Sequence, residues 1–126
     1  MFFSNNQTTK ETGDMSEQLA KHYLEKSGLL FITGNFHSRQ GEIDLIMKEQ
    51  QTLVFIEVKY RKNATFGGAI SAVTYKKQQK IKQCAKFYLQ QQNLNEYNTD
   101  CRFDVIALQG TQNEHDIEIS WLKNAF

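Results

Sequence analysis

Apolar residues along the chain follow two different spacings, and the changes between them mark where the elements of the fold begin and end. Helical spacing runs through residues 14–27 and again from Ile70 to about Gln92. Near-alternating spacing marks short strands, at about 29–37, 42–48, 53–60, 101–109 and 116–122. The predicted order is α-β-β-β-α-β-β, and the first three strands, joined by short turns, predict an antiparallel meander.

The pattern predicts one folded domain over residues 13–126. Residues 1–12 are polar and have no periodicity, so we expect a flexible N-terminal arm. Thr12 or Asp14 is the expected N-cap of the first helix, and Gly28 its stop. A chain of 126 residues that is 40% hydrophobic buries enough apolar surface to fold without metal or disulfide support, and it contains no repeat, linker or proline.

Cysteine content and hydropathy favour a cytoplasmic protein. The two cysteines, Cys84 and Cys101, lack metal-ligand spacing and are too few for a disulfide framework. No basic region followed by an apolar run opens the chain, and no stretch approaches the roughly 18 apolar residues of a membrane helix. We therefore expect neither signal-directed export nor a membrane span.

Charge is distributed unevenly, although the net charge is only +1. Between Val58 and Asn95 there is no Asp or Glu. The same stretch holds eight of the fifteen basic residues: Lys59, Arg61, Lys62, Lys76, Lys77, Lys80, Lys82 and Lys86. One interpretation is a solvated helix face. The other is a surface that neutralises the phosphates of a polyanion.

The two strands GEIDLIM and LVFIEVKYR predict a hairpin that turns at Gln50 and Gln51. This register gives one apolar face, made of the pairs Ile43–Val58, Leu45–Ile56 and Met47–Val54. The opposite face then follows, made of the pairs Ile46–Phe55, Asp44–Glu57 and Glu42–Lys59.

The pair Asp44–Glu57 is the main candidate for chemistry. Cross-strand Cβ atoms lie roughly 5 Å apart, and two like charges at that distance destabilise a sheet. A divalent cation such as Mg²⁺, which binds carboxylates at about 2.1 Å, would compensate them. Lys59 projects from the same face, where it could orient water or stabilise negative charge. The alternative is an ordinary solvent-exposed strand in which Glu57 pairs with Lys59 or Arg61.

These residues resemble the PD-(D/E)XK nuclease signature, in which Asp, Glu and Lys on a β-hairpin bind metal and cleave phosphodiesters. Ile43 stands where that motif has proline. More narrowly, the chain resembles the YraN-like family of small bacterial proteins, related to Holliday-junction resolvases. The resemblance is carried by Gly13, Glu17-x-x-Ala20-x-x-Tyr23-Leu24, Asn35, GEIDLIM (41–47), FIEVKYR (55–61), Phe66-Gly67, Val73-Thr74-x-x-Lys77 and RFDV (102–105).

The resemblance implies a restriction endonuclease-like three-layer α/β fold around a mixed central sheet. It implies catalytic roles for Asp44, Glu57 and Lys59. It also implies a Mg²⁺ or Mn²⁺ site formed by Glu17, Asp44, Glu57 and the carbonyl of Val58. By analogy with resolvases, a homodimer is a further expectation.

Lys77 lies four residues from both Val73 and Ile81, on the apolar stripe of the long helix, and should point towards the sheet. Either its stem packs on the core while the ammonium reaches solvent, or it is a second cation near the active face. Arg102 and Asp104 alternate with apolar residues and are expected to be structural.

Three functions remain open from the sequence. The first is a metal-dependent endonuclease that grips DNA through its backbone and selects branched shapes; the expected DNA-binding residues are Arg61, Lys62, Lys76, Lys77 and Lys80. The second is a nucleic-acid-binding accessory protein, for recombination or DNA uptake, that keeps the nuclease fold without cleavage. The third is an interaction protein whose charges only face solvent.

Overall fold

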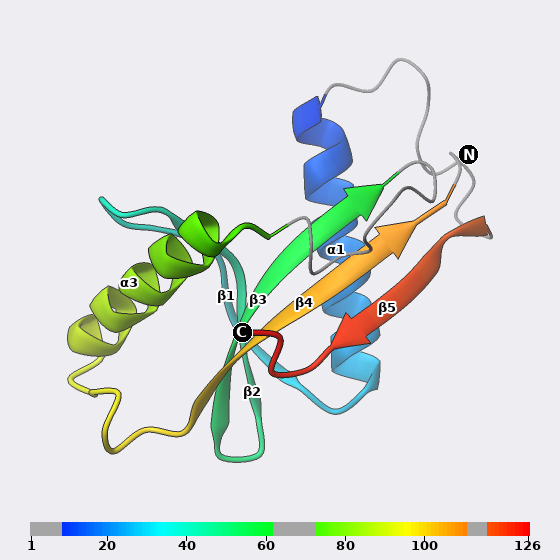
Figure 1. The fold of residues 1–126 in the computed structure, drawn as a ribbon. Helices are drawn as coiled ribbons and strands as arrows, with labels where there is room; N and C mark the ends of the chain where they lie inside the picture. Colours follow the sequence, from blue (N-terminus) through cyan, green and yellow to red (C-terminus); the bar gives the residue numbers. More distant parts are fainter. Residues whose placement is uncertain (1–8, 62–72, 111–115) are drawn as a thin grey trace.

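The computed structural model describes residues 9–61, 73–110 and 116–126, and they form a five-stranded sheet with a helix on each side (Figure 1). Its elements are α1 (Thr9–Lys26), β1 (Leu30–His37), β2 (Glu42–Glu49), β3 (Thr52–Arg61), α3 (Tyr75–Gln91), β4 (Cys101–Gln109) and β5 (Glu118–Leu122). The predicted order of helices and strands is confirmed.

The strands lie in the order β1-β2-β3-β4-β5, which is also their order along the chain. The pairs β1–β2, β2–β3 and β4–β5 are antiparallel, whereas β3 and β4 are parallel. Parallel neighbours need a crossover connection, and α3 lies in the segment that joins them. The sheet is therefore mixed, as the sequence predicts.

Two separate apolar cores make the three layers, one on each face of the sheet. Phe55 of β3 packs with Ile81 and Leu89 of α3. Its neighbour Val54 packs on the other face with Leu24 of α1. Strand alternation in β3 thus sends successive side chains to opposite helices. Burial on both faces explains why the central strands are almost continuously apolar.

Both helices differ from the predicted bounds at their N-termini. The helix α1 begins at Thr9, so Thr12 and Asp14 lie within it and do not cap it. The polar residues of this first turn carry no apolar periodicity, which is why the sequence did not reveal them. The helix α3 begins at Tyr75, where the hydroxyl of Thr74 accepts a hydrogen bond from the N–H of Lys77. Residues 1–8, most of the predicted arm, and Ile70 lie outside the described residues.

The hairpin register is confirmed from its turn up to the pair Leu45–Ile56. Gln50, in the turn, has a φ of 54°. The pair Ile43–Val58, however, is a wrong prediction: Ile43 packs on the face of α3, whereas Val58 and Leu45 pack on the face of α1. Regular alternation would have placed Ile43 with Leu45, so the pleat of β2 is interrupted at Asp44.

The two remaining predicted pairs, Asp44–Glu57 and Glu42–Lys59, lie beyond the last residue pair of the β2–β3 ladder. Glu42 is instead the partner of His37 in β1, and the Nδ1 atom of His37 lies 3.3 Å from the carboxylate of Glu42. The two strands of the hairpin therefore separate at the residues to which the sequence assigns chemistry.

Among the residues that the structure describes, no helix is long and apolar enough to cross a membrane. Both cysteines are free thiols, with Cys84 buried and Cys101 half-buried.

Candidate active site

Asp44 lies where β2 leaves its ladder with β3. Its side chain takes over the hydrogen bonding there: the main-chain N–H of Val58 donates to Oδ2 of Asp44 over 2.8 Å. A side-chain carboxylate thus accepts the bond that a β2 carbonyl accepts in a continuous ladder. This contact holds Asp44 against β3 beside Glu57, the residue that precedes Val58.

Glu57 is one of the few buried charged residues of the described chain, with 6% of its surface exposed. Burial, together with its hydrogen bond to Asp44 and the charge of Asp44, raises the pKa of Glu57 from its ordinary 4.5 to about 8. Nearby lysines offset only part of this rise. The predicted approach of the two acids is present, and Glu57 retains its proton near neutral pH in the absence of a further cation.

Lys77 approaches the same acids from α3. Its Nζ atom lies 3.6 Å from Oε1 of Glu57, and 42% of its side chain is exposed. Burial by itself would lower the pKa of the Lys77 ammonium, but its contact with Lys59 and the charges of the two carboxylates outweigh burial and raise that pKa. The prediction that Lys77 points towards the sheet is confirmed.

Lys59 completes the arrangement from β3. Burial and the contact with Lys77 lower the pKa of Lys59, although the two carboxylates pull it the other way. We call Asp44, Glu57, Lys59 and Lys77 the acid–lysine cluster. It joins two sheet strands to the first turn of α3 and brings together two acids and two bases in a partly desolvated place.

Glu17 reaches the neighbourhood of this cluster from α1. Burial and the charge of Asp44 raise the pKa of Glu17 to about 7, while a hydrogen bond with the side chain of Asn35 opposes the rise. Asn35 has a positive φ of 51°, a conformation that Asn adopts more readily than most residues. The placement near Asp44 is what the family resemblance implied and what the spacing of residues alone could not show.

A pocket of about 320 Å³ adjoins the cluster at the N-terminus of α3. Its lining includes one acid, Glu42, beside Thr74 and the three lysines Lys76, Lys77 and Lys80. No acidic residue lies in the first turn of α3, so the positive end of the helix dipole adds to the lysine charges. Arg61, at the end of β3, is exposed, and Lys62 lies outside the described residues.

The model of a protein family, described as "Uncharacterised protein family UPF0102", matches residues 16–108 of the chain. The chain belongs to the UPF0102 family. A UPF0102 protein of Colwellia psychrerythraea is 55% identical over 121 residues, which cover 96% of this chain and 92% of the relative. The YraN proteins of Escherichia fergusonii and Escherichia coli are 48% and 49% identical over 119 residues, covering 94% of this chain and 86% of each relative.

The residues that the UPF0102 model matches include Glu17 and the whole acid–lysine cluster. The YraN-like part of the predicted resemblance is thereby confirmed. The matched region ends within β4, so β5 and the C-terminal residues lie beyond it.

Two carboxylates in contact fit a small hard cation. In the described part of this UPF0102 chain, no three His, Cys, Asp or Glu side chains are arranged to hold a metal ion. Mg²⁺, however, is bound through as few as one or two carboxylates, with water and substrate phosphate in its other positions. The oxygen-only donor set of Asp44 and Glu57 suits Mg²⁺ or Mn²⁺. Glu17 would add a third carboxylate by approaching from α1.

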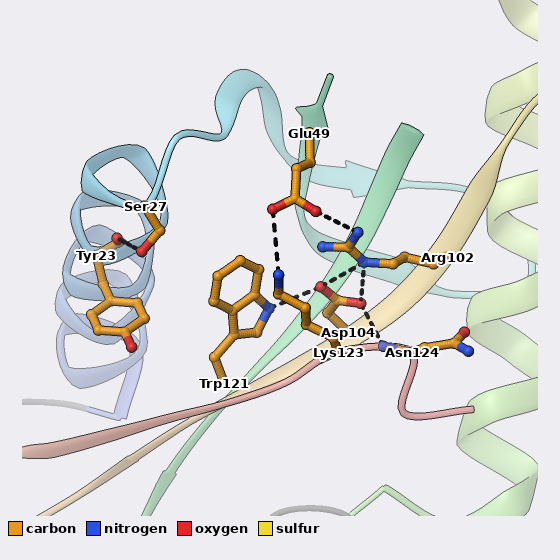
Figure 2. Close-up of polar contacts among 8 residues, drawn as sticks. All are labelled: Tyr23, Ser27, Glu49, Arg102, Asp104, Trp121, Lys123 and Asn124. Carbon is orange, nitrogen blue, oxygen red and sulfur yellow. Dashed lines mark hydrogen bonds and ion pairs between the residues drawn. The ribbon is translucent and has the colours of Figure 1, made fainter. Parts of the chain in front are cut away.

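A second polar network surrounds Asp104 of β4, and Figure 2 shows its members converging on that carboxylate. Asp104 is fully buried and accepts hydrogen bonds from Nε of Arg102, Nε1 of Trp121 and the main-chain N–H of Asn124. Arg102 also binds Glu49. These contacts tie β4 to the C-terminal segment, which agrees with the structural roles predicted for Arg102 and Asp104 in this UPF0102 protein.

Proposed function

We propose that this UPF0102 protein is a divalent-metal-dependent endonuclease that hydrolyses DNA phosphodiester bonds, with a preference for branched DNA. The observation that supports it most is the contact of Asp44 with Glu57 beside two lysines. A strand whose acids only face solvent has no need of a second acid and two lysines beside them. Phosphodiester hydrolysis does need a cation site and positive groups at one point.

In this proposal, Asp44 and Glu57, with Glu17 and the carbonyl of Val58, hold Mg²⁺ or Mn²⁺. When bound, the ion supplies an activated water and neutralises charge on the phosphate. The Nζ atom of Lys59 donates hydrogen bonds to the attacking water or to a phosphate oxygen, and so orients the reactants and counters the negative charge that develops. Asp44 is kept in place for this role by the N–H of Val58.

The pocket at the start of α3 supplies the grip on DNA. Lys76, Lys77 and Lys80 line it, and Arg61 and Lys62 follow Lys59 in sequence. Lysine contacts with phosphates fix position without reading bases, so recognition would depend on the shape of the DNA. Branched substrates with two-fold symmetry would be bound by a homodimer, and cleavage would take place in the cytoplasm.

A cleavage panel tests the proposal. Labelled single-stranded, duplex, flapped and four-way DNA are incubated with the purified protein in Mg²⁺, in Mn²⁺ and in EDTA. We expect cleavage that requires metal and is lost in Asp44→Asn and Glu57→Gln. Glu118→Gln, which changes an exposed glutamate of β5, is the matched control and should cleave normally.

Cleavage that persists unchanged in both acid variants would contradict the assignment. Metal-independent binding to branched DNA with no product in either ion would favour the non-catalytic accessory protein instead.

A further inference from the structure

Lys77 differs from the other lysines of its helix in where its ammonium lies. Among the described residues, it forms the ion pair with the buried Glu57, and it also lines the neighbouring pocket together with Lys76 and Lys80. Its Nζ atom lies against the sheet, 3.6 Å from Oε1 of Glu57, although 42% of the side chain is exposed.

The local structure explains why Lys77 takes this direction. Its N–H is fixed by the N-cap Thr74, over 3.1 Å. Val73 and Ile81, four residues away on either side, are 3% and 4% exposed, so the Cα of Lys77 lies on the buried stripe of α3. The stem must therefore leave the helix over the sheet, and it does so above Glu57.

The ammonium of Lys77 supplies a positive charge to an acid pair that needs one. A divalent ion held by Asp44 and Glu57 would take the same carboxylate oxygens. Two cations beside Oε1 of Glu57 repel each other strongly in a partly desolvated site, so the ion and the ammonium compete for this oxygen. Of the two lysines of the cluster, it is Lys77 whose Nζ atom lies within ion-pair distance of Oε1 of Glu57, so Lys77 is the one that the ion would displace.

We infer that Lys77 is a built-in counter-ion of the acid pair, which the metal ion displaces from Glu57 towards the pocket lined by Lys76 and Lys80. This inference rests on the proposed function, and it makes the position of the Lys77 ammonium depend on whether the metal ion is bound. While Lys77 is paired with Glu57, it opposes binding of the metal ion to that carboxylate. After the ion binds, the released ammonium faces the place proposed for DNA phosphate.

The binding of Mn²⁺ to the protein without DNA tests this inference separately from cleavage. The dissociation constant is measured by calorimetry at fixed pH for the wild type, Lys77→Met and Lys77→Arg. Lys77→Met keeps the apolar stem and removes the competing charge, so we expect Mn²⁺ to bind about tenfold more tightly. Lys77→Arg keeps the charge and should bind Mn²⁺ no more tightly than the wild type.

Lys76→Met and Lys80→Met are the matched controls, because each removes one positive charge from the same helix turns without touching Glu57. We expect their Mn²⁺ affinities to change by less than about twofold, since water and salt screen those charges. In EDTA, Lys77→Met should also melt at a lower temperature than the wild type. Saturating Mn²⁺ should raise its melting temperature by more than that of the wild type.

The inference is overturned if Lys77→Met binds Mn²⁺ with unchanged or weaker affinity, or if Lys77→Arg gains as much affinity as Lys77→Met. Either result, with a wild type that binds Mn²⁺ and cleaves DNA, leaves the proposed function intact. A wild type that binds no Mn²⁺ overturns both this inference and the metal-dependent function.

Discussion

The N–H of Val58 donates a 2.8 Å hydrogen bond to Oδ2 of Asp44 at the point where β2 and β3 stop pairing in register. The carboxylate of Asp44 therefore has two roles. It satisfies a main-chain donor that the interrupted ladder would leave without a partner, and it presents negative charge beside Glu57. The first role needs only a hydrogen-bond acceptor and the second needs a negative charge, so suitable substitutions separate them.

Asp44→Asn should keep the acceptor for Val58 and lose only the charge, so we expect its free energy of unfolding to stay within about 1 kcal/mol of the wild type. Asp44→Ala removes the acceptor as well and should cost about 1–3 kcal/mol. Both should lower cleavage by about 100-fold or more. Urea unfolding and cleavage rates, measured on the same samples, check this. Equal stability losses in the two variants would show that the hydrogen bond contributes nothing.

Glu57 should make the stability of the metal-free protein fall as pH rises. The pKa of Glu57 is about 8 in the folded protein and 4.5 without its surroundings, so the folded state holds a proton that the unfolded chain has released. Between these values, the free energy of unfolding falls with rising pH, and it levels off above about pH 8. Glu57→Gln should flatten this dependence in EDTA, as followed by urea unfolding from pH 5 to 9, whereas Glu118→Gln should retain it. Parallel curves for the wild type and Glu57→Gln would contradict the raised pKa.

Lys80 should contribute to DNA binding through charge alone. In Lys80→Gln, the slope of log affinity against log salt concentration should become shallower by about 1, as one phosphate contact is lost. Affinities for different sequences should fall together. Lys26→Gln, at the end of α1, provides the control and should keep the wild-type slope. A fall in affinity confined to one DNA sequence would mean base recognition.

The network around Asp104 should matter for stability and not for metal binding. Asp104→Ala leaves the partly buried Arg102 with one carboxylate partner fewer and should cost about 3–5 kcal/mol. Trp121→Phe removes one charge-assisted hydrogen bond and should cost about 1.5–3 kcal/mol. Urea unfolding gives both values. A changed Mn²⁺ affinity in folded Trp121→Phe would show that the network does reach the acid–lysine cluster.

Much of the hairpin could be predicted because its register depends on local alternation. The pair Leu45–Ile56 follows from matching apolar faces, and it is present. The failure at Ile43 has an equally local cause. A side chain of Asp44 can replace a carbonyl as acceptor, and the strand then leaves its pleat, which no apolar pattern records.

Contacts between the helices and the sheet were harder to predict from the sequence. Helical spacing directed Lys77 towards the sheet, but its contact with Glu57 depends on how α3 docks, and docking is set by the core between α3 and the sheet. Glu17 is a polar residue on a helix, and its spacing does not distinguish it from the other polar residues of that helix. Its placement beside Asp44 was accessible only through resemblance to a family.

The parallel pairing of β3 with β4 has a consequence for the sequence of folding events. The hairpin of β2 and β3 closes through its own turn, and hairpins form in about 1–10 μs. Parallel strands meet only after the crossover through α3, and such non-local pairings are slow because a long loop must close first. We therefore expect Asp44 and Glu57 to meet early, and Lys77 to join them only when α3 docks on the sheet. In that order of events, a partly folded chain would carry two neighbouring acids without their ammonium, and the charged centre would be complete only in the folded molecule.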